Sequence, residues 1–355
     1  MTRSGGYDDA ARTEQLLGSF DRLRRRLGMP GLAVAMLRGE QVLAAVGLGW
    51  ADVERRVRVT LDTPFDVASV SKPISAVLAL RLAEQGHLDL DRPLRDDPAF
   101  LAFVESARAE DDVFFRDYHA ETLTLRHLLT MTANGVPGTR FLYNPPSFSW
   151  ASRPVARAAG RAFSALVTGQ VFDVAGMTRS ARVYRALPLP AYLEEALARP
   201  YRRTRDGPRR STPPPAQGDG AAGGVISTVA DLARFDGALS AGLLLSEASM
   251  RTWWTPGRSP SGASLPYGLG WFVGSWAGRR VVWHTGLWED RYSALYLKVP
   301  DEALTLILLA NSDGLRWPSR LDEAALDRSA FARLYLRTFP QTPGEVSEPD
   351  DSRNR

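Results

Sequence analysis

Apolar residues near the start of the chain recur first with the period of a helix and then in the short runs that are typical of strands. A helix is predicted over residues 14–27, where the apolar side chains fall on one face. Residues 31–48 form two apolar runs on either side of the polar turn Arg38-Gly39-Glu40, and this pattern predicts a β-hairpin. The fold is therefore expected to begin with a helix and two antiparallel strands.

A second helix is predicted from Ser71 to Glu84. Its apolar residues have helical spacing, Pro73 is tolerated because it lies in the first turn, and Gly86 is placed to end the helix. Ser69 is therefore expected at the N-terminal end of this helix, where the helix dipole favours negative charge.

The middle and the end of the chain have different patterns. Residues 88–220 contain helical patches between long polar connections, and the proline-rich stretch 202–220 is expected to be a loop. Further helices are predicted at residues 123–131, 154–167, 191–198, 228–239 and 322–338. Strand patterns return near the C-terminus at residues 268–274, 280–284, 291–299 and 303–311.

Together these elements predict an α/β (α+β) fold with two lobes. An antiparallel sheet flanked by helices would be built from both ends of the chain, residues 15–87 and 221–338, and residues 88–220 would form a mainly helical second lobe. A site is expected between the lobes. Residues 1–14 are expected to be an N-terminal tail and residues 339–355 a disordered tail.

The composition excludes several kinds of protein and site. The chain has no cysteine, which removes disulfides, thiolate zinc sites and thiol nucleophiles. No apolar run approaches the roughly 20 residues that span a bilayer, so no membrane partner is expected. The first twenty residues lack the apolar core of a secretory signal, and we therefore expect a cytoplasmic protein. The four histidines are scattered without metal-ligand spacing, so neither a metal nor another cofactor is expected.

A formal net charge of +4 and two arginine clusters, at residues 22–26 and 202–210, raise the question of nucleic-acid binding. The first cluster falls on the polar face of the predicted helix 14–27, and no nucleic-acid recognition motif accompanies either cluster. Nucleic acid is therefore not expected as a partner, and the sequence leaves the oligomeric state undetermined.

Lysine is rare in this chain: all but two of its 44 basic residues are arginine. Arginine cannot lose its proton in a protein, whereas a buried lysine can. One of the two lysines completes the S-x-x-K arrangement Ser69-Val70-Ser71-Lys72, which on a helix places hydroxyl and amine on one face. A desolvated lysine can take the serine proton and so activate the hydroxyl as a nucleophile. The alternative is that Ser69 only caps the helix and Lys72 is solvated.

The sequence around this pair resembles a known superfamily. Residues 63–72, TPFDVASVSK, are similar to the first motif of the serine β-lactamases and penicillin-binding proteins, in particular the class C-like branch with its related family VIII-type carboxylesterases. Other segments match in the order that this family has them, over about residues 15–335: residues 126–132, 137–143, 176–177, 221–228, 267–271 and 284–286.

The resemblance implies roles for several residues. Ser69 would be the acylated nucleophile, and Lys72 and Tyr143 would share the acid and base work. His284, Thr285 and Gly286 would line the strand beside the substrate. The backbone N–H groups of Ser69 and Leu287 would form the oxyanion hole.

Two departures from the family pattern bear on the substrate. Tyr143-Asn144-Pro145 stands where the lactamases have Tyr-x-Asn, so the amide that would grip a lactam side chain is absent or displaced to Asn144. His284 replaces the usual lysine of the third motif, which weakens the anchor for a substrate carboxylate.

We therefore expect a serine hydrolase that acts on a small ester or amide, foremost a carboxylesterase. One alternative is a β-lactamase or a D-amino peptidase or carboxypeptidase. The other is a catalytically silent binding or scaffold member of the family.

Overall fold

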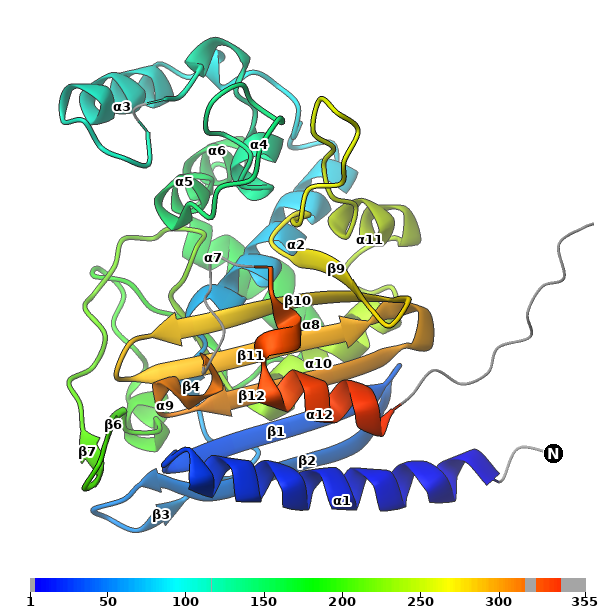
Figure 1. The fold of residues 1–355 in the computed structure, drawn as a ribbon. Coiled ribbons are helices and arrows are strands. Elements are labelled where there is room, and N and C mark those ends of the chain that lie inside the picture. The colour runs from blue at the N-terminus through cyan, green and yellow to red at the C-terminus, as the bar shows by residue number, and fades with distance from the viewer. Residues whose placement is uncertain (1–3, 116, 317–323, 340–355) are drawn as a thin grey trace, which may run out of the picture.

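A seven-stranded antiparallel sheet forms the centre of the molecule (Figure 1). The structure is a computed structural model that describes residues 4–115, 117–316 and 324–339. The strand order is β3-β2-β1-β12-β11-β10-β9, so the two ends of the chain meet where β1 pairs with β12. Its strands are β1 (Gly31–Arg38), β2 (Gln41–Asp52), β3 (Val57–Arg58), β9 (Phe272–Trp276), β10 (Arg279–Trp288), β11 (Tyr292–Val299) and β12 (Leu304–Ala310).

Helices cover both faces of this sheet. On one face lie α1 (Ser4–Arg26) and α12 (Ala330–Thr338), which meet through the rings of Phe20 and Phe331, 5.4 Å apart. On the other face lies α10 (Val229–Ser240), and behind it α2 (Ser71–Glu84) (Figure 1). The predicted fold class is confirmed: an antiparallel sheet built from both chain ends between layers of helices.

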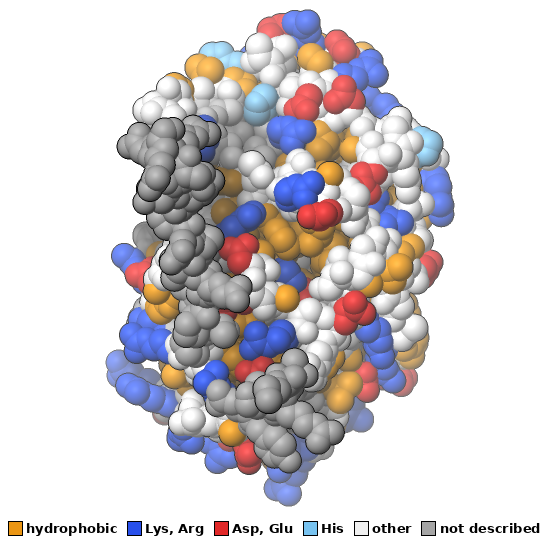
Figure 2. All heavy atoms as spheres, turned by 90° about the vertical axis from the view of Figure 1, so that its right-hand side faces the viewer, with side chains coloured by type: hydrophobic (Ala, Val, Ile, Leu, Met, Phe, Trp, Pro, Cys, Tyr) orange, Lys and Arg blue, Asp and Glu red, His pale blue; other side chains and the backbone are white. Residues whose placement is uncertain are grey.

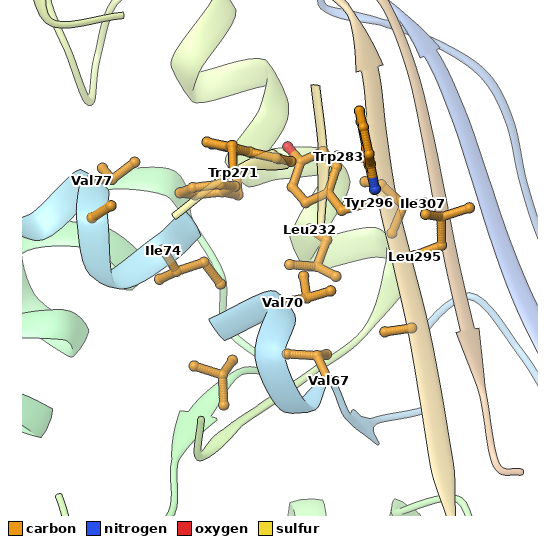
Figure 3. Close-up of a cluster of buried hydrophobic side chains, with 14 of the residues drawn as sticks. Val67, Val70, Ile74, Val77, Leu232, Trp271, Trp283, Leu295, Tyr296 and Ile307 are labelled. Atoms are coloured by element: carbon orange, nitrogen blue, oxygen red, sulfur yellow. The ribbon is translucent and has the colours of Figure 1, made fainter. Parts of the chain in front are cut away.

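Helix α2 is buried over most of its length. All residues from Ser71 to Leu80 are buried, and Figure 3 shows Val70 and Ile74 pointing toward Leu232 of α10 and Leu295 of β11. Burying each such aliphatic side chain contributes about 1.5–3 kcal/mol relative to leaving it exposed. The start of α2 is therefore held rigidly between the sheet and the second lobe.

The second lobe consists of short helices that lie beyond one edge of the main sheet (Figure 1). They are α3 (Pro98–Ala109), α4 (Leu125–Leu129), α5 (Pro145–Trp150), α6 (Ser152–Ala159) and α7 (Phe163–Val167). A small sheet, β4 (Phe65–Asp66), β8 (Val225–Ser227) and β5 (Ala181–Arg182), lies at its base, and α8 (Asp173–Ala175), α9 (Ala191–Ala196) and α11 (Glu247–Trp253) complete the described helices.

The stretch 202–220, expected to be a loop, begins with a hairpin of β6 (Tyr201–Thr204) and β7 (Gly207–Arg210). This hairpin packs against the main sheet, because the Tyr201 N–H donates to the carbonyl of Asn311 over 2.8 Å. The last part of the predicted helical lobe, 88–220, thus belongs to the sheet side of the molecule. The residue on which the hairpin docks is distant in the chain, so no local pattern indicates that contact.

The ends of several elements differ from the prediction. Helix α1 begins at Ser4 within the expected tail 1–14, and Asp9 forms an ion pair with Arg38 of β1 (2.9 Å). Strand β9 begins only at Phe272, since the Gly268 N–H donates to the Trp271 carbonyl (2.8 Å) and closes a turn.

At the other end of the chain, α12 begins at Ala330 rather than at residue 322. Phe339 is buried, and residues 340–355 of the expected tail lie outside the described residues.

The surface carries mixed charge on the face seen in Figure 2, where basic and acidic side chains are interspersed with hydrophobic ones. Among the described residues, no helix combines the length and the hydropathy that crossing a membrane requires.

The close approach of β10 to the start of α2 yields a first prediction. A Cβ atom added at Gly286 of β10 would lie 2.1 Å from the carbonyl oxygen of Val67, so replacing Gly286 by alanine must push the strand away. We expect Gly286→Ala to lower the free energy of unfolding by about 1–3 kcal/mol, the usual cost of overpacking. The measurement is the urea midpoint of the purified variant.

Gly237→Ala is the matched control, because Gly237 lies inside α10 and a Cβ there meets nothing within 4 Å. Alanine should stabilise this helix by about 0.5–1 kcal/mol. Equal midpoints for the two variants would show that β10 does not pass Val67 this closely.

Candidate active site

Ser69 lies in a single 3₁₀ turn, η1 (Ala68–Val70), that leads directly into α2. The turn is held by hydrogen bonds on both sides of the serine. The carboxylate of Asp66 accepts from the Ala68 N–H (2.8 Å), and the hydroxyl of Ser71 donates to the Ala68 carbonyl (2.6 Å). Ala68 has φ +47°, a conformation that non-glycine residues rarely adopt. The Ser69 backbone is thus fixed in a strained turn, while the residue stays half-buried rather than sealed.

Lys72 reaches back from the first turn of α2 to this serine. Its Nζ lies 2.7 Å from Ser69 Oγ and 2.9 Å from the carbonyl oxygen of Ala222. The side chain is fully buried, and burial lowers the pKa of Lys72 to about 7. A substantial fraction of the amines is therefore uncharged near neutral pH and can accept the Ser69 proton.

The second lysine shows what a charged lysine needs in this fold. Lys298 of β11 is also buried, but its Nζ contacts the carboxylate of Asp236 and the hydroxyl of Thr305 (2.9 Å). Lys72 has two neutral oxygens as partners where Lys298 has a carboxylate. The difference between an amine poised to lose its proton and an ion pair follows from these partners.

Tyr143 stands on the other side of the lysine. The centre of its ring is 5.4 Å from Lys72 Nζ, and its buried hydroxyl has no hydrogen-bond partner among the described residues. Burial raises the pKa of Tyr143 above its usual value, against an opposing interaction with Ser69. The phenol therefore keeps its proton at neutral pH, which is compatible with the predicted sharing of acid and base work between Tyr143 and Lys72.

Strand β10 carries the predicted third motif past the Ser69 turn. Gly286 lies against the carbonyl of Val67, the residue before η1, and β10 packs against η1. Thr285 contributes its backbone carbonyl to His284 Nδ1 (2.7 Å), and its side chain is half-buried. The oxyanion role of Leu287 and the substrate contacts of Thr285 and Gly286 stay predictions.

His284 is completely buried, and its Nε2 lies 2.8 Å from the hydroxyl of Tyr267. Burial, together with the charge of Lys72, keeps the pKa of His284 well below its usual range. The third motif therefore presents an uncharged imidazole at the position where the family usually has a lysine.

The side chain of Asn144, a predicted site residue, makes structural hydrogen bonds within the second lobe. It is buried, its carbonyl oxygen caps α5 by accepting from the Ser147 N–H (2.9 Å), and its amide donates to the carbonyl of Phe114 (2.8 Å). These contacts hold together the loop that carries Tyr143, and they do not support the substrate-binding role predicted for Asn144.

Three residues of the site were not among the site residues predicted from the sequence. Ala222 accepts from Lys72, Tyr267 binds His284, and Asp66 supports the Ser69 turn, with burial raising the pKa of Asp66 to about 6 against the hydrogen bond from Ala68. All three belong to segments that match the family in sequence, and only the folded backbone shows which groups their polar atoms contact.

The arrangement has the parts that acyl transfer needs. Ser69 supplies a hydroxyl, Lys72 an uncharged amine within hydrogen-bonding distance, and Tyr143 a held proton, at the N-terminal end of a helix whose dipole favours a developing negative charge. Ser69 and Lys72 come from η1 and the start of α2, and Tyr143 comes from the loop before α5.

Comparisons with known proteins agree with this geometry. The Beta-lactamase family model matches residues 18–330. The chain is similar to Penicillin-binding protein 4* of Bacillus subtilis, with 25% identity over 83% of this chain and 70% of that protein. It is also similar to a D-aminopeptidase of Gluconobacter oxydans, with 30% identity over 49% of this chain and 37% of that protein.

Solved structures share the fold. A D-amino acid amidase from Ochrobactrum anthropi has a TM-score of 0.68 at 21% identity over 85% of this chain and 91% of that chain. A class C β-lactamase from Rhodobacter sphaeroides has a TM-score of 0.65 at 20% identity over 90% and 96% of the two chains. With its family model covering most of the sequence, this chain belongs to the Beta-lactamase family, within the serine β-lactamase and penicillin-binding-protein superfamily.

Proposed function

We propose that this protein is a serine hydrolase that cleaves an ester or amide bond through an acyl-enzyme on Ser69. The observation that supports this most directly is the 2.7 Å contact between Ser69 Oγ and a buried lysine that has no carboxylate partner. Other members of the family are named for hydrolysis of β-lactams, D-amino acid amides or peptides.

The reaction then follows from the positions of the protons. Uncharged Lys72 takes the hydroxyl proton as Ser69 Oγ attacks the substrate carbonyl, and the oxyanion forms beside the backbone N–H of Ser69. Tyr143 gives its proton to the leaving alcohol or amine as the carbonyl–leaving-group bond breaks, and it regains a proton from Lys72. In the second half, water attacks the acyl-enzyme. The water gives up a proton to the base as it attacks, and Ser69 Oγ regains a proton as the acid product leaves.

An ester is the substrate that these contacts favour. The uncharged His284 offers no fixed cation for a substrate carboxylate. The side chain of Asn144 is engaged in capping α5. A carboxylesterase needs neither group. Amide or D-amino peptide hydrolysis is the second candidate, supported by the similarity to a D-aminopeptidase.

Covalent labelling tests the nucleophile. A fluorophosphonate probe should add one mass increment to the intact protein, because the activated Ser69 hydroxyl displaces its leaving group. Ser69→Ala should lose the increment, and Ser261→Ala, at an exposed serine, should keep it. Labelling that survives in Ser69→Ala removes Ser69 from this role, and a wild type that is not labelled favours the silent scaffold.

The pH dependence tests the base. Because burial lowers the pKa of Lys72 to about 7 and only its uncharged form accepts a proton, kcat/KM for an ester should rise through about pH 7 and level off above it. Lys72→Arg keeps a permanent positive charge and should lower kcat/KM by about 10²–10⁴-fold at all pH values. A wild-type profile that is flat from pH 5 to 9 would contradict a lysine base.

A substrate panel separates the candidate activities. With p-nitrophenyl acetate, nitrocefin and D-alanine p-nitroanilide at equal concentration, we expect a p-nitrophenol burst and turnover on the ester and slower reactions on the other two. A higher kcat/KM on nitrocefin or on the anilide would assign the protein to lactam or D-amino amide hydrolysis instead.

A further inference from the structure

Tyr267 and His284 form a buried pair beneath the candidate active site. Tyr267 lies in the turn before β9, and both side chains are fully buried. The tyrosine ring packs against Phe141 and Phe272, with ring centres 5.5 and 4.9 Å apart, so the hydroxyl is aimed at the imidazole by aromatic packing. Nothing in the proposed proton transfers uses Tyr267.

The partners of the imidazole determine which nitrogen carries the proton. Nδ1 lies 2.7 Å from the backbone carbonyl of Thr285, and a carbonyl oxygen can only accept, so Nδ1 is the protonated nitrogen. Nε2 then has a free lone pair, which accepts from the Tyr267 hydroxyl over 2.8 Å. Both nitrogens are satisfied when the imidazole is neutral, in the tautomer with the proton on Nδ1.

A second proton on the ring would break this arrangement. It would have to sit on Nε2, where the Tyr267 O–H already points, and the phenol would have to turn its own proton toward another acceptor. Burial of a charged imidazole adds to the cost.

The groups around the pair also oppose a cation. Lys72 of α2, Tyr143 of the loop before α5 and Tyr267 are the titratable side chains that interact with His284, and none of them is a carboxylic acid. On β11, Tyr296 lies opposite His284 in register, and Asp236 behind it is bound by Lys298 and by the Tyr296 hydroxyl. Among the described residues, the imidazole thus has no carboxylate to stabilise its charged form.

We propose that Tyr267 is a positioning residue that holds His284 as the neutral Nδ1–H tautomer, and that this uncharged third motif makes the enzyme select esters whose leaving group carries no negative charge. The selectivity part rests on the proposed hydrolase function. The tautomer part does not, because it depends only on the two hydrogen bonds of the imidazole. Removing the phenol hydroxyl should therefore change both the protonation of His284 and the choice of substrate.

The first experiment reads the tautomer directly. Long-range ¹H–¹⁵N spectra of the full-length protein should resolve the four histidines, with His284 assigned by its loss in His284→Gln. In the wild type we expect one protonated Nδ1 and one bare Nε2 for His284, unchanged from about pH 5 to about pH 8, the range in which an unperturbed imidazole changes charge. In Tyr267→Phe, the bare Nε2 has lost its donor, and we expect a mixture of tautomers or titration at a higher pH.

Tyr292→Phe is the matched control. Tyr292 is a buried tyrosine of β11 whose hydroxyl donates to the backbone carbonyl of Ala198 (2.6 Å), so this variant loses one buried hydrogen bond away from His284. Its His284 spectrum should equal that of the wild type. A wild-type His284 that carries its proton on Nε2, or one that gains a second proton between about pH 5 and about pH 8, overturns the proposal. A Tyr267→Phe spectrum that matches the control overturns it as well.

The second experiment reads the selectivity with two esters that differ in one charge, phenyl acetate and 3-carboxyphenyl acetate. The wild type should favour the neutral ester in kcat/KM by about tenfold or more at every pH, because a carboxylate that loses hydration beside an uncharged third motif gains no ion pair in return. His284→Lys should lower this preference throughout, and Tyr267→Phe should lower it only toward acidic pH, where the released imidazole gains a proton. The Tyr292→Phe preference should not change.

The two experiments fail in distinguishable ways. If no ester is turned over through Ser69, the proposed function falls and the spectra still decide the role of Tyr267. If esters are turned over and the tautomer is as expected, but the preference is the same in Tyr267→Phe and His284→Lys as in the wild type, the selectivity part is overturned.

Discussion

The site depends on one buried amine that lacks a counter-ion. Removing a charged ammonium group from water is costly, and a buried lysine meets that cost either by pairing with a carboxylate or by giving up its proton. Both solutions occur in this protein: Lys298 contacts Asp236, whereas within the described part of the chain Lys72 has Ser69 and a backbone carbonyl as its hydrogen-bond partners. The surroundings of α2 therefore favour an uncharged amine at Lys72, which is what the proposed base requires.

Close packing of backbone against backbone keeps the amine dry and near its serine. Gly286 lets β10 pass against the Val67 carbonyl, and Gly270, at φ +77°, lets the turn before β9 lie against the Lys72 carbonyl, where a Cβ would come within 2.8 Å. Side chains at these two positions would hold the strand and the turn away from the start of α2. The same approach brings the third motif beside the Ser69 turn, so burial of the base and assembly of the site have a common structural cause.

The remaining polar groups divide into those placed for reaction and those that hold others in place. No hydrogen-bond partner within normal distance meets the buried Tyr143 hydroxyl in the described part of the chain, as the proposed transfer to a leaving group requires, whereas both nitrogens of His284 are already bonded. Asn144 and Asp66 hold the loops that carry Tyr143 and Ser69. A positively charged third motif would add a second cation near Lys72, and the neutral imidazole avoids that repulsion.

The sequence by itself determined the elements and motifs that are local. Helix α2 has the predicted bounds, the strands β10, β11 and β12 lie within a few residues of their predicted positions, and the S-x-x-K spacing already implied that Ser69 and Lys72 share a helix face. Periodicity and i, i+3 spacing extend over one element, so they can be read without knowing the fold. Only the tertiary structure decided that Lys72 is buried and that Tyr267 binds His284. It also decided that Asn144 caps α5 and that the β6–β7 hairpin docks on Asn311. Each of these depends on residues that are distant in the chain or on solvent exclusion by several elements together, and no local pattern records such contacts.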